Sequence, residues 1–245
     1  MSVYEELPPP PELAPLVACL WRQTAGEDEV QRVVPDGCVD LLWVSNGSDV
    51  RASVAGPDTG VHLESLSVGT SIVGVRFRPG AAATVLGVPL DALRDERVPL
   101  PELWGPAGGE LGERVVTADQ PEAVTAQVVA DRLARLPEVP GLPGGWPPEG
   151  PGLAEALAGR AGPGTVRQMA DDLGLSERQL HRRCLVAFGY GPKTVQRVLR
   201  FQAALRDARA GRRLADVAAD AGYADQAHMS REVRDLAGVP ITALL

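Results

Sequence analysis

The sequence has few of the residues that cross-link a protein or anchor it in a membrane. Its 245 residues include three cysteines, Cys19, Cys38 and Cys184, which are widely spaced and odd in number. We therefore expect neither a disulfide framework nor a paired-cysteine metal site, and a reducing, cytoplasmic setting. No run of 18 apolar residues occurs, so no membrane span is expected. The acidic N-terminal segment also lacks the pattern of a signal peptide.

The motifs of several enzyme classes are missing as well. The chain contains no Gly-x-Ser-x-Gly nucleophile elbow, no His-Glu-x-x-His zinc motif and no phosphate-binding loop. We therefore predict that the protein is not an enzyme and uses no cofactor and no metal. An enzyme fused to a binding module is kept as a minor alternative.

The positive charge is unevenly distributed. The formal net charge of −8 argues against a nucleic-acid partner when it is taken alone. However, residues 1–152 carry ten basic and 22 acidic residues, whereas residues 153–245 carry 14 basic and ten acidic ones. A basic C-terminal part is typical of nucleic-acid contact, although uneven charge often has no function. Lys193 is the single lysine, and such Arg-rich usage indicates a GC-rich bacterial genome.

A stretch rich in proline and glycine divides the chain. Eleven of the 16 residues from 137 to 152 are Pro or Gly, a density that disfavours both helix and strand. We interpret residues 137–152 as a semi-extended linker. It would join a domain at 1–136 to a second domain at 153–245.

The two domains have different secondary-structure patterns, which predicts an α+β chain. Before the linker, short apolar runs between turn residues predict strands over 39–44, 49–55 and 71–77. Helices are predicted over 81–86, 90–93 and 121–136. After the linker every element reads as helical, over 151–160, 165–173, 176–187, 192–210, 214–221, 225–236 and 240–244.

The C-terminal part contains a near-repeat of about 48 residues in which a helix, a glycine turn and a second helix follow one another. In the first copy Gly174 supplies the turn and Ser176 caps the next helix. That helix would present outward Arg178, Gln179, His181, Arg182 and Arg183. Arginine can form bidentate hydrogen bonds with guanine or with phosphate. The simpler alternative is that these residues form a solvated helix face.

The second copy turns at Gly222, and its last helix would present outward Gln226, Ala227, Ser230 and Arg231. Glutamine can bind the edge of adenine. The helix over 192–210 would separate the two copies by about 28 Å, near the roughly 34 Å repeat of duplex DNA. Lys193, at its start, would contact phosphate or simply be solvated.

Several of these segments resemble a known family. Phe188–Lys193 with Arg197 and Arg200, and Ala221–His228 with Arg231, resemble the tandem helix-turn-helix domain of AraC/XylS-type transcription regulators. The resemblance implies double-stranded DNA as a partner. It also implies that Arg178, Arg182, Gln226 and Arg231 are groove contacts.

The N-terminal segments Pro35–Leu42, Ala55–Thr59 and Gly74–Gly80 resemble the regulatory domain of one AraC-type subgroup. This implies a sensor domain, for which we consider a small cupin-like barrel. Asp36 and Asp40 form a carboxylate pair, although turn capping by Asp36 is the simpler role. Arg76 and Arg78 would lie on one side of a strand and could hold an anionic effector, or they could simply face solvent.

We interpret the chain as a cytoplasmic transcription regulator whose DNA binding is modulated by a small-molecule effector at residues 1–136. The alternative is that this domain binds no small ligand and serves only dimerisation or protein–protein contact. A homodimer and a contact with RNA polymerase remain open in either case.

Overall fold

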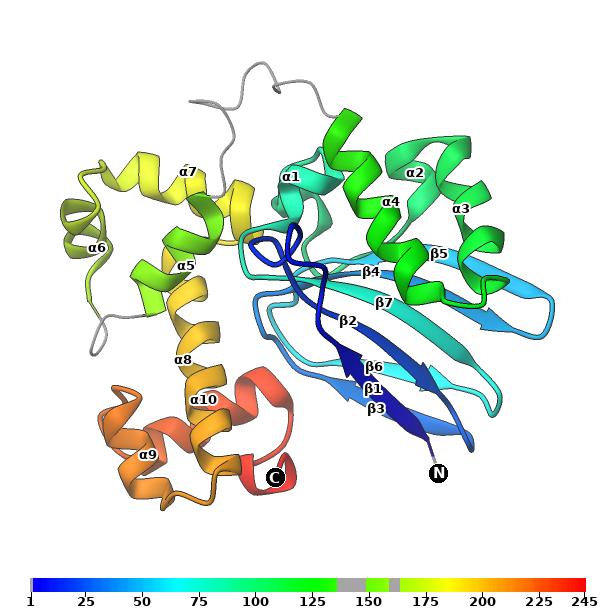
Figure 1. The fold of residues 1–245 in the computed structure, drawn as a ribbon. Coiled ribbons are helices and arrows are strands. Elements are labelled where there is room, and N and C mark those ends of the chain that lie inside the picture. Colours follow the sequence, from blue (N-terminus) through cyan, green and yellow to red (C-terminus); the bar gives the residue numbers. More distant parts are fainter. Residues whose placement is uncertain (1, 136–148, 159–163) are drawn as a thin grey trace.

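The computed structural model describes residues 2–135, 149–158 and 164–245. The N-terminal part contains all the strands together with several helices, and every element from residue 149 onward is helical (Figure 1). The predicted fold class, a β-rich N-terminal domain followed by an all-helical C-terminal domain, is confirmed.

The N-terminal part contains two antiparallel sheets. The larger sheet has six strands in the order β1-β2-β7-β4-β5-β8. Its strands are β1 (Val3–Leu7), β2 (Val17–Thr24), β7 (Ser71–Phe77), β4 (Val39–Asn46), β5 (Asp49–Ala55) and β8 (Arg97–Pro99). The second sheet pairs β3 (Glu29–Val33) with β6 (His62–Leu66). Because β1 and β8 are edge strands, the larger sheet is open and does not form the closed barrel that we considered.

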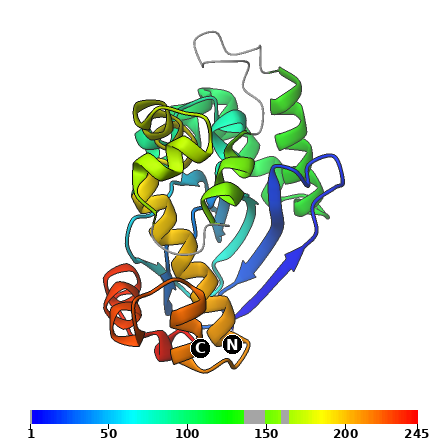
Figure 2. The ribbon, with the colours of Figure 1, turned by 90° about the vertical axis from the view of Figure 1, so that its left-hand side faces the viewer.

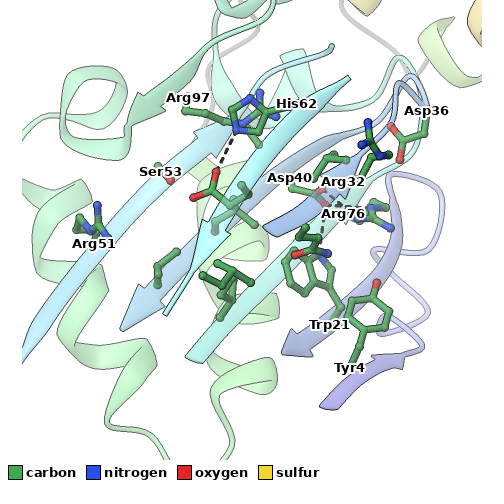
Figure 3. A pocket seen from close by; sticks show the side chains of 18 of the residues that line it. Tyr4, Trp21, Arg32, Asp36, Asp40, Arg51, Ser53, His62, Arg76 and Arg97 are labelled. Atoms are coloured by element: carbon green, nitrogen blue, oxygen red, sulfur yellow. Dashed lines mark hydrogen bonds and ion pairs between the residues drawn. The ribbon is translucent and has the colours of Figure 1, made fainter. Parts of the chain in front are cut away.

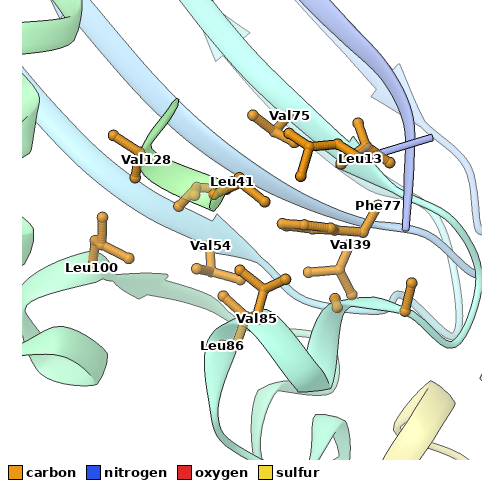
Figure 4. Packing of buried hydrophobic residues seen from close by; sticks show 14 of the residues in the cluster. Leu13, Val39, Leu41, Val54, Val75, Phe77, Val85, Leu86, Leu100 and Val128 are labelled. Carbon is orange, nitrogen blue, oxygen red and sulfur yellow. The ribbon is translucent and has the colours of Figure 1, made fainter. Parts of the chain in front are cut away.

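Alternation along the central strands gives the large sheet two different faces. On one face, Val39 and Leu41 of β4 and Val75 and Phe77 of β7 are buried in the main hydrophobic core (Figure 4). Helices cover this face: α1 (Ala82–Leu86), η1 (Leu90–Leu93), α2 (Leu100–Trp104), α3 (Pro106–Val116) and α4 (Pro121–Arg135).

On the opposite face a smaller apolar cluster joins the large sheet to the β3–β6 pair. Trp21 and Ile72 from the large sheet pack there with Leu66 of β6. Gly74 is paired with Trp21 across β7 and β2. A Cβ atom at Gly74 would lie 2.4 Å from the Trp21 ring, so the missing side chain makes room for the indole.

The C-terminal part is built around one long helix. Its elements are α5 (Glu149–Ala158), α6 (Val166–Asp172), α7 (Glu177–Phe188), α8 (Pro192–Arg209), α9 (Leu214–Asp220), α10 (Gln226–Ala237) and η2 (Ile241–Ala243). The first half of α8 packs into one core with α5, α6 and α7. Its second half packs into another core with α9 and α10. Figures 1 and 2 show these two units at opposite ends of α8.

The predicted linker needs a correction at its end. Residues 137–148, including Trp146, lie outside the described residues. Residues 149 and 150, which we expected to be extended, form the first turn of α5 together with residues 151 and 152, where the predicted helix began. Proline is tolerated in a first helical turn because its missing N–H would have no partner there. Within the described ranges, no helix is both long and apolar enough to cross a membrane.

Candidate functional site

Two capping boxes position the first outward helix. Thr165 caps α6 and Ser176 caps α7, each paired with the glutamine three residues later. Gly174 adopts a φ of +65°, which lets the chain turn between the two helices. The side-chain oxygen of Gln179 accepts hydrogen bonds from the backbone N–H and the hydroxyl of Ser176, at 2.8 and 2.9 Å. Gln179 therefore stabilises the start of α7.

The outer face of α7 presents two exposed guanidinium groups, those of Arg178 and Arg182. Neither makes a hydrogen bond or ion pair with any other residue that the structure describes. Arg183 is half-buried and interacts within the protein. The ring of His181 lies over Gly191, since a Cβ there would be 3.1 Å from the His181 Cε1 atom. Arg178 and Arg182 are thus the α7 cations that can reach an external partner without first breaking a contact.

The second outward helix, α10, begins with a different cap. The Asp225 carboxylate accepts a hydrogen bond from the His228 backbone N–H at 2.6 Å. Tyr223 is buried beneath the turn, as expected from the sequence, with its ring centroid 5.4 Å from that of His228. The outer face of α10 then carries Gln226, Ala227 and Arg231, which are exposed, and Ser230, which is half-buried.

The basic residues of α8 are engaged inside the protein. Arg200 forms an ion pair with Glu232 of α10 at 2.7 Å, and its guanidinium lies 4.6 Å from the Tyr223 ring centroid. Arg197 pairs with Glu232 and Asp235. The Lys193 ammonium donates to the Gly164 carbonyl. The ion pairs of Arg197 and Arg200 orient α10 on α8. The hydrogen bond to Gly164 engages Lys193, for which the sequence left a phosphate contact open.

A cavity of about 830 Å³ lies between the large sheet and the β3–β6 pair, and α8 forms part of its wall. The large sheet contributes Trp21, Asp40 and Arg76, which Figure 3 shows gathered at one end of the cavity. The β3–β6 strands and α8 contribute further residues: Gln31, Arg32, Val33, His62, Glu64, Leu66, Gln202, Leu205 and Arg209. The walls therefore come from both the N-terminal and the C-terminal parts of the chain.

An ion pair belongs to the sheet wall of this cavity. Arg76 and Asp40 are partners across β7 and β4, and the guanidinium donates to both carboxylate oxygens at 3.1 and 3.2 Å. Trp21 Nε1 donates to the same carboxylate at 3.2 Å. Burial lowers the pKa of Arg76, but Asp40 and Asp36 outweigh burial and the pKa is raised. Arg76 therefore stays a fixed cation in the cavity wall.

Asp36 lines the same cavity and also caps the turn before β4. Its carboxylate accepts a hydrogen bond from the Cys38 backbone N–H at 2.8 Å, which is the turn role that we considered simplest. Burial raises the pKa of Asp36, with Arg76 acting in the opposite direction. The Cys38 thiol has a strongly raised pKa because it is buried beside carboxylates.

Arg78 lies apart from the other three predicted effector residues. It follows the last residue of β7, is exposed, and donates from Nε to the Ala14 carbonyl at 2.8 Å. The strict alternation that we used to pair Arg76 with Arg78 ends with the strand at Phe77. The structure thus brings Asp36, Asp40 and Arg76 together and directs Arg78 elsewhere.

Comparison with known proteins identifies the C-terminal part. Residues 169–245 match the family model described as a helix-turn-helix domain. This part of the chain therefore carries a helix-turn-helix domain, as the sequence motifs predicted. Residues 5–99 match a second model, described as a domain of unknown function (DUF6597).

The remaining comparisons are weaker. No curated protein sequence matches the chain. The crystal structure of ToxT from Vibrio cholerae O395 is 9% identical, covering 92% of this chain and 95% of that chain, with a TM-score of 0.49. Unsaturated fatty acid-bound wild-type ToxT from Vibrio cholerae strain SCE256 is 14% identical, covering 92% of each chain, with a TM-score of 0.46.

Sequence reasoning missed the contacts that join the helix-turn-helix domain to the N-terminal domain. Gln202 of α8 donates from Nε2 to the Pro35 carbonyl at 2.6 Å. Arg32 donates to the Ala237 carbonyl at 2.8 Å. Nothing in the local sequence marks these pairs, because their members lie 167 and 205 residues apart.

The sequence analysis did not predict the cavity. Asp40, Leu42 and Val44 alternate with the core residues of β4, so they lie on the second face of the sheet and line the cavity. Trp21 and His62 also line it. The sequence pattern gave no means of assigning them, since β2 and β6 were not predicted as strands.

Proposed function

We propose that this protein is a sequence-specific transcription regulator that binds double-stranded DNA through both helix-turn-helix units. The observation that carries the proposal is the exposed, unpartnered guanidinium pair of Arg178 and Arg182 on the capped helix α7. Such groups suit the guanine edge or a phosphate. We assign the same role to Gln226, Ala227, Ser230 and Arg231 on α10, with Gln179, His181, Arg183 and Lys193 as supporting contacts.

The length of α8 supports simultaneous use of the two units. Its 18 residues extend roughly 27 Å at about 1.5 Å per residue. That span is near the roughly 34 Å between successive major-groove faces of the duplex. The Arg200–Glu232 ion pair also holds α10 in one orientation on α8. We therefore assign α7 and α10 to two half-sites on one side of the DNA.

We further propose that residues 1–136 form an effector domain whose ligand occupies the cavity. A volume of about 830 Å³ is typical of small-molecule sites. Five arginines and three carboxylates line it, namely Arg32, Arg51, Arg76, Arg97, Arg209, Asp36, Asp40 and Glu64. Arg51, Arg76 and Arg97 are paired with Asp49, Asp40 and Asp58. Arg32 and Arg209 donate instead to backbone carbonyls, and these two guanidinium groups favour a ligand with an anionic group. Since walls of both domains would touch it, such a ligand could act on DNA binding.

The alternative is that the N-terminal domain pairs subunits or contacts another protein, such as RNA polymerase, without a small ligand. The exposed apolar side chains Val30 and Leu63 on the outer side of the β3–β6 pair favour a contact of this kind. In both cases the protein would act on the chromosome in the cytoplasm, without catalytic activity of its own.

DNA binding is tested by fluorescence anisotropy with the DNA upstream of the gene, in excess non-specific competitor and at two salt concentrations. We expect saturable binding that weakens with salt, and a loss of roughly 1–3 kcal/mol in Arg182→Ala. Arg114→Ala, at an exposed arginine of α3, is the matched control and should bind normally. If residues 153–245 also failed to select any sequence from a randomised library, the DNA-binding proposal would be wrong.

The effector is tested by thermal shift against a panel of metabolites. A specific ligand raises the melting temperature because it binds the folded state alone. Ser53→Trp places an indole in the cavity and should abolish that shift. A flat response across the panel, together with concentration-dependent dimerisation, would favour the protein-contact alternative.

A further inference from the structure

The N-terminal domain holds the C-terminal ends of both recognition helices by arginine side chains. At the end of α7, Arg94 donates to the carbonyl of the C-cap residue Gly189 at 3.4 Å. At the end of α10, Arg32 donates to the carbonyl of the last helical residue, Ala237, at 2.8 Å. The last carbonyls of a helix have no partner within the helix, and cations are stabilising there. The shorter of the two hydrogen bonds, from Arg32 to the end of α10, therefore helps to orient that helix.

The two attachments differ in strength. The end of α7 is also packed tightly, since a Cβ at Gly189 would lie 2.6 Å from Pro57 and 2.8 Å from the Leu90 carbonyl oxygen. The hydrogen bond from Arg94 is long and adds little to that packing. The end of α10 has fewer neighbours in the N-terminal domain. A Cβ at Gly238 would lie 3.2 Å from Arg32 and from Val61.

The two arginines also differ in their relation to the cavity. Arg32 is exposed and is among the residues that line the cavity, so it lies at the cavity mouth (Figure 3). Gln31 and Val33, on the other face of β3, line the same cavity. Arg94 is not among the lining residues. A change in the cavity can thus reach the end of α10 through the Arg32 side chain.

We propose that Arg32 is a positioning residue that couples the cavity to the second helix-turn-helix unit. A ligand anion at the cavity mouth competes with the Ala237 carbonyl for the Arg32 guanidinium, because charged acceptors form the stronger hydrogen bonds. Through Arg32 the effector then changes recognition of the half-site bound by α10. This inference rests on the proposed function.

The test uses full-length protein and a DNA site selected from a randomised library. Footprinting locates the two half-sites, and Arg182→Ala identifies the one bound by α7. Affinities are then measured for the intact site and for versions with one half-site scrambled. Discrimination at a half-site is the ratio of the affinity for the intact site to that for the site with this half-site scrambled. For Arg32→Ala we expect this ratio to fall roughly tenfold at the α10 half-site, which corresponds to the loss of one charge-assisted hydrogen bond. Discrimination at the α7 half-site should stay within about twofold of wild type.

Three further variants separate coupling from general damage. Arg94→Ala, the matched control, should leave both half-sites unchanged. Arg32→Lys keeps a donor at this position and should recover part of the discrimination. Gln31→Trp fills the cavity from the strand that carries Arg32, and it should alter recognition of the α10 half-site.

Equal loss at both half-sites in Arg32→Ala, or no loss at the α10 half-site, would overturn the coupling while leaving the proposed function intact. A wild-type protein that enriches no sequence would overturn the proposed function and the coupling with it.

Discussion

Substituting Gly189 tests the contact between α7 and the N-terminal domain. Gly189 ends α7 with a φ of +80°, and a Cβ there would lie 2.6 Å from Pro57 Cγ and 2.8 Å from the Leu90 carbonyl oxygen. Gly174 has a similar φ of +65° but no atom within 4 Å of the added Cβ. Gly189→Ala and Gly174→Ala therefore share the backbone strain and differ in the clash.

The expected magnitudes follow from these two contributions. A left-handed residue with a side chain costs about 1–2 kcal/mol, which is the whole expected effect of Gly174→Ala. Overpacking against neighbours that cannot move freely adds roughly 1–3 kcal/mol. Leu90 meets the new Cβ through its backbone oxygen, so relief requires the domains to shift. Gly189→Ala should therefore lower the free energy of unfolding by about 2–5 kcal/mol in total.

Urea denaturation of the full-length protein, followed by circular dichroism, measures both changes. If the N-terminal and C-terminal parts unfold separately, the transition of the helical part is compared. Equal losses in the two variants, within about 0.5 kcal/mol, would mean that the end of α7 does not dock on Pro57 and Leu90. The attachment of the first helix-turn-helix unit described above would then be wrong.

Three other outcomes are expected. Asp36→Asn should raise the free energy of unfolding at neutral pH. The folded-state pKa of Asp36 is raised, so the free energy of unfolding of the wild type falls as the pH rises through that pKa. A free energy of unfolding that stays the same from acidic to neutral pH in both proteins would contradict this. Tyr190→Phe should leave stability unchanged or increased, since the buried Tyr190 hydroxyl has no hydrogen-bond partner among the described residues; a loss above about 1 kcal/mol in urea denaturation would reveal a missed partner. Iodoacetamide should alkylate the thiols of the native protein slowly at neutral pH and those of the unfolded protein at ordinary rates. The reason is that burial raises the pKa of Cys19 to about 11, that of Cys184 to about 12 and that of Cys38 well above its usual range. A native cysteine that is labelled rapidly would show that its pKa is not raised.

Local sequence was sufficient for the helical domain. The predicted helices over 176–187, 192–210 and 225–236 agree with α7, α8 and α10 to within one residue at each end. Ser176, Gly174 and Pro192 mark these ends through short-range effects: a capping side chain, a left-handed turn and a ring that favours a first helical turn. Such effects act within a few residues, so they can be recognised in the sequence.

The β-rich domain was predicted in part. The strands at 49–55 and 71–77 agree with β5 and β7, and that at 39–44 covers most of β4. Five strands were missed, namely β1, β2, β3, β6 and β8. Among them β3 and β6 are short and half polar, and they are strands because they pair with each other and cover a face of the large sheet. Context of this kind outweighs intrinsic strand preference.

The sequence alone therefore determined the chain's division into a β-rich and a helical domain, the two helix-turn-helix units and the outward position of Arg178 and Arg182. The tertiary structure alone decided that Asp36, Asp40 and Arg76 share a cavity while Arg78 does not. It also decided that Arg32 and Gln202 join the domains. Helix caps and periodicity depend on neighbours in the chain, whereas cavities and domain contacts depend on how distant segments pack, which no local pattern records.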